Sequence, residues 1–68
     1  MNPEHMVHMA NQIAFNFAAY PREEAVANVA DHLQKFWERR MRQQIVEYIA
    51  NGGRGLHEVV VEAVGRLR

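Results

Sequence analysis

The stretch from Ala25 to Ile49, AVANVADHLQKFWERRMRQQIVEYI, decides the fold of this chain. Its large apolar side chains recur every three or four residues, which is the period of an α-helix rather than the alternation of a β-strand. The predicted buried positions are Ala25, Val26, Val29, Ala30, Leu33, Phe36, Trp37, Met41, Ile45, Tyr48 and Ile49. One continuous helix of about thirty residues fits this register, as do two helices separated near Trp37-Glu38. Globular helices usually run ~8–20 residues, which favours the break.

The residues before this stretch predict another helix, from about Pro3 to Ala19. Asn2 suits the N-cap, Pro3 stands where a missing N–H costs nothing, and Glu4 favours the positive helix end. Helical spacing relates Met6, Ala10, Ile13 and Phe17, with Val7, Ala14 and Ala18 beside them. Tyr20-Pro21 ends this helix because the residue before a proline is biased away from the helical region. Pro21 then falls at or near the start of the second helix.

Asn51-Gly52-Gly53 is the clearest helix stop in the chain, because asparagine and glycine accept the left-handed backbone conformation. A last helix is predicted from Leu56 to about Leu67, with one apolar face: Leu56, Val59, Val60, Ala63, Val64 and Leu67. Valines favour strands, but an isolated strand has nothing to pair with. The sequence therefore predicts an all-α fold, a small bundle of three to four short helices forming a single helical domain over residues 1–68.

Size and composition limit the function further. The chain has 68 residues, no cysteine and 49% apolar residues. A core of this size usually supplies only ~3–5 kcal/mol without disulfides or metals, so we expect the chain to complete its core against a partner. No apolar run approaches the ~20 residues of a membrane span, and Met1-Asn2-Pro3-Glu4 does not begin a signal peptide. We therefore expect a cytoplasmic protein with no membrane contact.

The neutral total charge hides an asymmetry. Residues 1–34 hold one base and four acids, a net of −3, whereas residues 35–68 hold seven bases and four acids, a net of +3. This division makes the second half a candidate docking face for an acidic partner, or allows the two halves to attract each other. A solvated and internally compensated surface is the simplest interpretation.

The residue types exclude most independent catalysis. Cysteine, serine and threonine are all absent, which removes the usual thiol and hydroxyl nucleophiles. Gly52-Gly53-Arg54-Gly55 lacks the spacing and the preceding strand of a phosphate-binding loop, so these glycines are predicted to form a turn. We predict no catalytic and no cofactor-binding residue on this chain.

The four histidines do not predict a metal site. His5 and His8 can share a helical face with Glu4 nearby, but a site needs three or four ligands and no further ligand has matching spacing. His32 and His57 are isolated in the sequence, and all four are expected to be ordinary exposed histidines.

The cluster from Lys35 to Arg42 supports an alternative function, a small helical nucleic-acid-binding or regulatory module. Basic side chains alternate there with Phe36 and Trp37, a pattern that suits backbone contact and base stacking. Against it, the chain is neutral, with an isoelectric point near 6.9, and phosphate-driven binding requires a net positive charge. An interaction module that docks on a larger protein is the competing class.

Three motifs together resemble a known family. They are MANQIA at Met9–Ala14, HL…FW…RMR from His32 to Arg42, and GGxGL at Gly52–Leu56 followed by Ala63-Val64. In this order and spacing they resemble the delta subunit of the NAD-dependent, molybdenum-containing formate dehydrogenases, from about Met6 to Leu67. The chain departs from the family pattern where Arg39 and Glu58 replace frequent prolines and where His8 replaces a frequent arginine.

The resemblance implies a non-catalytic accessory subunit that supports assembly or stability of a complex oxidising formate to carbon dioxide. It implies no cofactor on this chain. The other subunits of such a complex carry a molybdenum or tungsten bis-pterin cofactor, iron–sulfur clusters and flavin, and pass electrons to NAD. The implied partners are the other formate dehydrogenase subunits, first the catalytic alpha subunit, and no nucleic acid. Apart from the resemblance, a third alternative is a self-assembling helical oligomer, in which the isolated chain forms a homodimer to cover its apolar face.

Partner-binding residues are carried over from the motifs: Asn11, Phe36, Trp37, Arg40, Met41, Arg42, Gly53, Gly55 and Leu56. Arg40 and Arg42 are the predicted docking cations, because arginine makes directional bonds to carboxylates and carbonyls. For Asn11, a hydrogen bond between helices and a contact with the partner are equally good interpretations. Gly53 and Gly55, with Gly52, are expected to shape the turn into the last helix.

Overall fold

The computed structural model describes residues 1–68 and contains four α-helices and no strand. They are α1 (Pro3–Asn16), α2 (Arg22–Phe36), α3 (Arg39–Ala50) and α4 (Glu58–Val64). The all-α prediction is therefore confirmed. Of the two alternatives for the central stretch, the structure has the broken one, with α2 ending at Phe36 and α3 beginning at Arg39.

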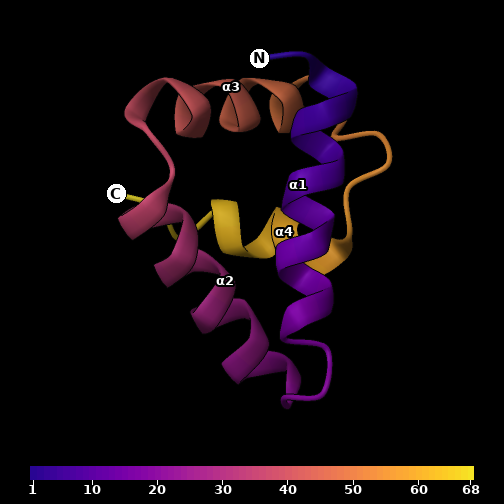
Figure 1. Ribbon diagram of the computed structural model, residues 1–68, viewed down its shortest axis with the longest axis vertical. Coiled ribbons are helices and arrows are strands. Elements are labelled where there is room, and N and C mark those ends of the chain that lie inside the picture. The colour runs from indigo at the N-terminus through magenta and orange to yellow at the C-terminus, as the bar shows by residue number, and fades with distance from the viewer.

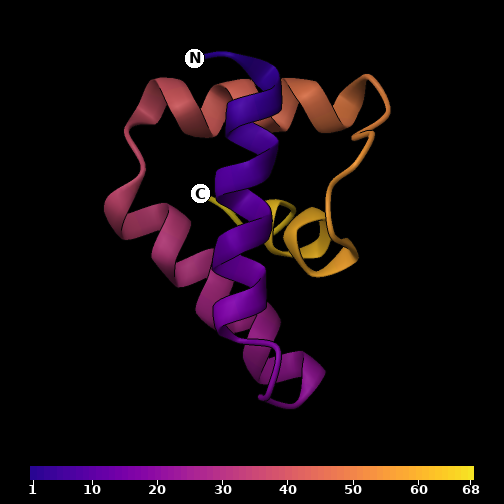
Figure 2. The ribbon, with the colours of Figure 1, turned by 45° about the vertical axis from the view of Figure 1, so that its right-hand side comes forward.

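The short α4 lies at the centre of the molecule. Helices α1 and α2 meet at the turn that joins them and diverge from it, and α4 lies between them (Figure 1). Helix α3 crosses the open end, beside the start of α1 (Figure 2). Fourteen apolar side chains form the core, and Met6, Leu33 and Ile45 are the largest that are fully buried. No helix here has the length and apolar character needed to cross a membrane.

Helix α1 begins as predicted and ends early. The Asn2 side chain caps it, with its Oδ1 accepting hydrogen bonds from the backbone N–H groups of Glu4 at 2.8 Å and His5 at 3.2 Å. The last helical residue is Asn16, so the predicted end at Ala19 is wrong. Residues 17–20 instead form tight turns with bonds to the carbonyl three residues back. The chain needs this turn to reverse direction before Pro21, and Ala18, predicted to be buried, is exposed.

The break between α2 and α3 separates two neighbouring aromatic side chains. Trp37 leaves the helix with an extended backbone, φ −84° and ψ 137°, and turns into the core, where it is 6% exposed. Phe36, the last residue of α2, is 71% exposed, so its predicted burial is wrong. Only one of the two can enter the core once the helix ends. Glu38 occupies the N-cap of α3 but makes no capping bond with its side chain.

The predicted stop at Asn51-Gly52-Gly53 is confirmed. The N–H of Gly52 bonds to the Ile49 carbonyl and that of Gly53 to the Tyr48 carbonyl, both at 3.0 Å. This pair of bonds is the Schellman arrangement, which requires a positive φ after the helix end. Gly52 and Gly53 provide it, with φ of 120° and 62°.

Helix α4 is shorter than the predicted Leu56–Leu67 and begins at Glu58. His57 precedes it as the N-cap, with its Nδ1 accepting a hydrogen bond from the backbone N–H of Val59 at 3.1 Å. His57 is half-buried and packs edge-on against Phe15, so describing it as an ordinary exposed histidine is wrong. Leu56 and Leu67 lie outside the helix, yet both pack against the core.

Candidate partner-binding surface

The nine residues predicted to bind a partner lie in two regions of the fold. One is the corner segment, Phe36–Arg42, where α2 meets α3, and the other is the α3–α4 loop, Asn51–His57, together with Asn11 of α1. Each region combines side chains that hold the fold together with others that face solvent. Only the side chains that face solvent are free to bind a partner.

The side chain of Asn11 bonds within the chain. Its Nδ2 donates to the Gly55 carbonyl and its Oδ1 accepts from the backbone N–H of His57, both at 2.9 Å. These bonds join α1 to the loop that leads into α4. Of the two interpretations of Asn11, the structure shows the internal hydrogen bond.

Glycines let the α3–α4 loop pass close to its neighbours. Gly53 lies in the left-handed region above Ile49, and a Cβ there would sit 3.5 Å from the Ile49 backbone. Gly55, with φ of 84°, lies against Val7 of α1. Leu56 is half-buried against the core. In this region the predicted residues shape the backbone or pack on the core, and few of their side chains are free to bind a partner.

Two residues of the corner segment also face inward. Met41 is half-buried against the core that contains Trp37. Arg42 folds back over the end of α2, with its Nη1 donating to the Trp37 carbonyl and, at 3.3 Å, to the Gln34 carbonyl. The Gln34 carbonyl belongs to the last turn of α2 and the Trp37 carbonyl to its C-cap, and a cation is favourable at this end of a helix. Arg42 thus stabilises the end of that helix.

The rest of the corner segment faces solvent. Phe36 contacts only one other ring, that of His32, at a centroid distance of 4.9 Å. Arg39 and Arg40 are exposed and form no ion pair. His32 is half-buried rather than fully exposed as expected. Phe36 and Arg40 are the two carried-over residues whose side chains remain largely available to a partner.

The placement of the basic cluster does not favour the nucleic-acid alternative. Lys35 is paired with Asp31 at 3.1 Å, Arg42 with backbone carbonyls, and Trp37 is buried. A stacking platform requires exposed aromatic rings within a basic surface. Of the residues that suggested one, Phe36, Arg39 and Arg40 remain exposed, and so does Lys35 although it is paired with Asp31.

Ion pairs beside α4 join the two halves of the sequence, but only the Arg66–Glu23 pair joins a base of the second half to an acid of the first. Arg22 of α2 bonds to Glu62 at 2.7 Å and to Glu58, while Arg66 bonds to Glu23 and to Glu62. The hydrogen bond from Arg22 is the main cause that lowers the pKa of Glu62 below its ordinary 4.5. The same bond raises the pKa of Arg22, and the bond to Glu23 raises that of Arg66. This network compensates part of the charge within the chain.

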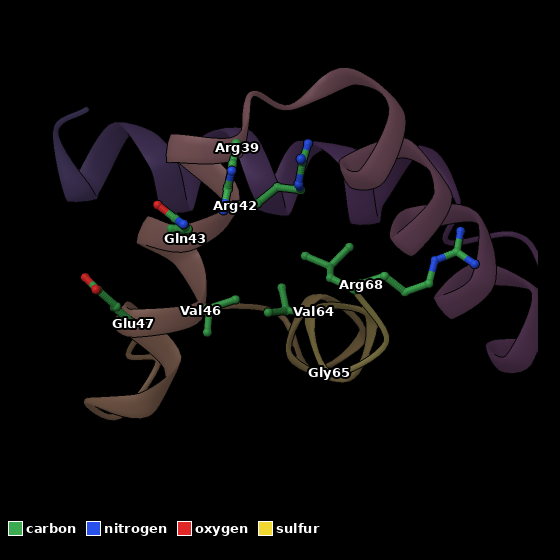
Figure 3. Close-up of a pocket in the computed structure, with 9 residues that line it drawn as sticks. Arg39, Arg42, Gln43, Val46, Glu47, Val64, Gly65 and Arg68 are labelled. Carbon is green, nitrogen blue, oxygen red and sulfur yellow. The ribbon is translucent and has the colours of Figure 1, made fainter.

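A further surface, which the sequence did not reveal, is the Val46 groove. It is an open groove of about 800 Å³ between α3 and the end of α4 (Figure 3). Its lining is Arg39, Arg42, Gln43, Val46, Glu47, Val64, Gly65, Leu67 and Arg68. Val46 lies off the predicted buried stripe of its helix, and that was the only signal in the sequence for an apolar side chain left at the surface.

The acidic and imidazole side chains do not gather. No three histidine, aspartate or glutamate residues lie close enough together to hold a metal ion.

One comparison with known proteins identifies relatives of the chain. The sequence model of the family described as the NADH-dependent formate dehydrogenase delta subunit FdsD matches residues 5–64. The match includes α2, α3, α4 and all but the first two residues of α1. No curated protein and no solved structure matches the chain.

Proposed function

The chain belongs to the family of the NADH-dependent formate dehydrogenase delta subunit FdsD, and from this membership we propose that it is a non-catalytic accessory subunit of a formate dehydrogenase complex. Its proposed role is to support the assembly or the stability of the complex that oxidises formate to carbon dioxide. The observation that carries this proposal is the extent of the family match, which runs through all four helices rather than over one motif.

The chemistry of the side chains supports a role without a cofactor of its own. Iron–sulfur clusters are held mainly by cysteine thiolates, and this chain has no cysteine. We therefore assign the bis-pterin metal cofactor, the iron–sulfur clusters, the flavin and the NAD site to other subunits. Their protein surfaces, above all that of the catalytic alpha subunit, are the proposed partners, and the proposed location is the cytoplasm.

Co-expression tests this function. The alpha, beta and gamma subunits are produced with and without this chain, and the complex is purified through a tag on the alpha subunit. The chain is expected to co-purify in a fixed ratio to the alpha subunit. Without it, a role in assembly lowers the yield and metal content of the complex. A role in stability leaves both unchanged but shortens the half-life of formate oxidation activity.

The contrary result is equally clear. A complex that forms with the same yield, metal content and half-life in both preparations, and from which the chain is absent, would exclude the proposed function.

A further inference from the structure

Helix α3 is the least covered helix of the fold. Each of the other three helices buries four side chains, whereas α3 buries Ile45 alone. Met41, Tyr48 and Ile49 are only partly covered. Val46, one residue after Ile45, is 47% exposed, so one apolar side chain of α3 remains open to solvent.

Val46 is the apolar residue that α3 contributes to the wall of the Val46 groove. Val46 of α3 and Val64 of α4 point toward each other across it (Figure 3). Leu67, half-buried just after α4, extends the apolar lining. Apolar side chains that converge in a concave surface are the usual setting for an anchor residue of a partner.

The groove also carries uncompensated positive charge. Its lining includes the side chains of Arg39, Arg42 and Arg68 against that of Glu47, and the α-carboxylate of Arg68 reduces the excess from two positive charges to one. None of these four side chains takes part in an ion pair. The acidic side chains of the charge network on α4 are already bound to Arg22 and Arg66, so this surface is complementary to an acidic ligand.

On the premise of the proposed function, we propose that the Val46 groove binds an acidic amphipathic segment of another formate dehydrogenase subunit. An apolar side chain of that segment lies between Val46 and Val64, and its carboxylates face Arg39 at the rim of the groove. Arginine suits this role, because its planar group makes paired bonds to a carboxylate.

A second copy of this chain is a poor occupant. In a two-fold symmetric contact each patch meets its own equivalent, so two surfaces with the same excess of positive charge would be brought together. Like charges placed together across an interface are unfavourable. The charge of the groove therefore selects a different, acidic chain.

Two variants test the groove in the co-expressed complex. Arg39→Glu reverses an exposed charge at its rim, and Val46→Asp places a charge on its apolar wall. Each is expected to lower the amount of this chain recovered per alpha subunit by about tenfold or more, as for hot-spot residues. Both positions are exposed, so the circular dichroism of the isolated variants should remain helical.

The matched controls are an Arg→Glu and a Val→Asp substitution at exposed positions outside the groove. Arg54→Glu reverses an exposed arginine of the α3–α4 loop, which follows the end of α3 opposite to Arg39 and does not line the groove. Val61→Asp alters an exposed valine of α4 that does not line the groove. Both control variants are expected to co-purify like the wild-type chain.

A photo-crosslinking amino acid identifies the occupant. With p-benzoylphenylalanine in place of Val46, irradiation of the purified complex is expected to join this chain to a net-acidic peptide of another subunit. In place of Val61, the same probe should give no such product. A crosslink to a second copy or to a basic segment would overturn the inference, as would no crosslink from position 46 in a complex that holds the chain.

Failure of the inference and failure of its premise give different results. If the wild-type chain is absent from the complex, the proposed function fails and the inference fails with it. If the wild-type chain is present and both groove variants are retained as well as the controls, only the inference is overturned.

Discussion

The side-chain oxygen of Asn11 accepts a hydrogen bond from the backbone N–H of His57 at 2.9 Å, linking the middle of α1 to the N-cap of α4. The amide nitrogen of the same side chain donates to the Gly55 carbonyl, also at 2.9 Å. One side chain thus satisfies two backbone groups of an irregular loop, and it fixes where the central helix begins.

We predict that Asn11→Ala destabilises the fold by about 1–2 kcal/mol, because a partly buried donor and an acceptor both lose their partner. Urea unfolding followed by circular dichroism measures this change. Gln12→Ala, which removes an exposed neighbour on the same helix with no bond within the chain, is the matched control and should change stability by less than about 0.5 kcal/mol. Equal effects of the two substitutions would show that the Asn11 bonds contribute nothing.

The neighbouring aromatic residues Phe36 and Trp37 should contribute very differently to the stability of the fold. Trp37→Ala is expected to cost about 3–5 kcal/mol, because it empties a core site. That loss is comparable to the ~3–5 kcal/mol available to a chain of this size, so the variant should be largely unfolded. Phe36→Ala should stay within about 0.5 kcal/mol of the wild type, as thermal melts by circular dichroism will show. A Phe36 variant as damaged as the Trp37 variant would contradict the arrangement of the corner.

Replacing the two predicted docking arginines, Arg40 and Arg42, should also change the stability of the fold by different amounts. Arg42→Met removes the bonds to the carbonyls of Trp37 and Gln34 at the end of α2 and is expected to cost about 1–2 kcal/mol. Arg40→Met removes an exposed and unpaired cation, so we expect less than about 0.5 kcal/mol. Urea unfolding of both variants measures these changes in the free energy of unfolding. Any loss of docking in Arg42 variants must therefore be corrected for loss of folding, whereas a loss in Arg40 variants reports on docking directly.

Acid should weaken the charge network of α4. The pKa of Glu62 is lowered in the folded chain, first by the hydrogen bond from Arg22, so the unfolded chain binds the proton more readily. The contribution of Glu62 is complete above its unfolded pKa, near 4.5, and is lost as the pH falls through its lower folded pKa. Melting temperatures between pH 7 and pH 3 should therefore fall less for Glu62→Gln than for the wild type. Glu24→Gln, which alters a glutamate outside the network, should follow the wild type, and parallel curves for all three would contradict this role of Glu62.

The all-α class and most helix ends followed from local chemistry. The cap at Asn2, the double glycine after Asn51 and the three-to-four-residue apolar register act within a few residues, so the sequence displays them. The break at Trp37-Glu38 could only be favoured by length, because the apolar register continues through it. Tertiary packing settles it by drawing Trp37 into the core.

The roles of individual surface residues depended on long-range contacts. Asn11 meets residues more than forty positions away, and Arg42 reaches carbonyls that become available only because α2 ends where it does. The Val46 groove exists because α4, centred in the fold, leaves one flank of α3 uncovered. The periodicity of α3 places Val46 off the buried stripe but does not show that α4 leaves this flank uncovered.

The central claim is that this chain is a subunit of a formate dehydrogenase complex, and the most direct test is its presence in the purified enzyme. Native mass spectrometry of the complex, isolated through the alpha subunit from cells that also produce this chain, measures it. We predict a species heavier than the alpha–beta–gamma assembly by a whole number of copies of the 7.9 kDa chain, which dissociates as an intact subunit. A fully active complex with the mass of alpha, beta and gamma alone, whose yield and lifetime do not change when this chain is omitted, would contradict the claim.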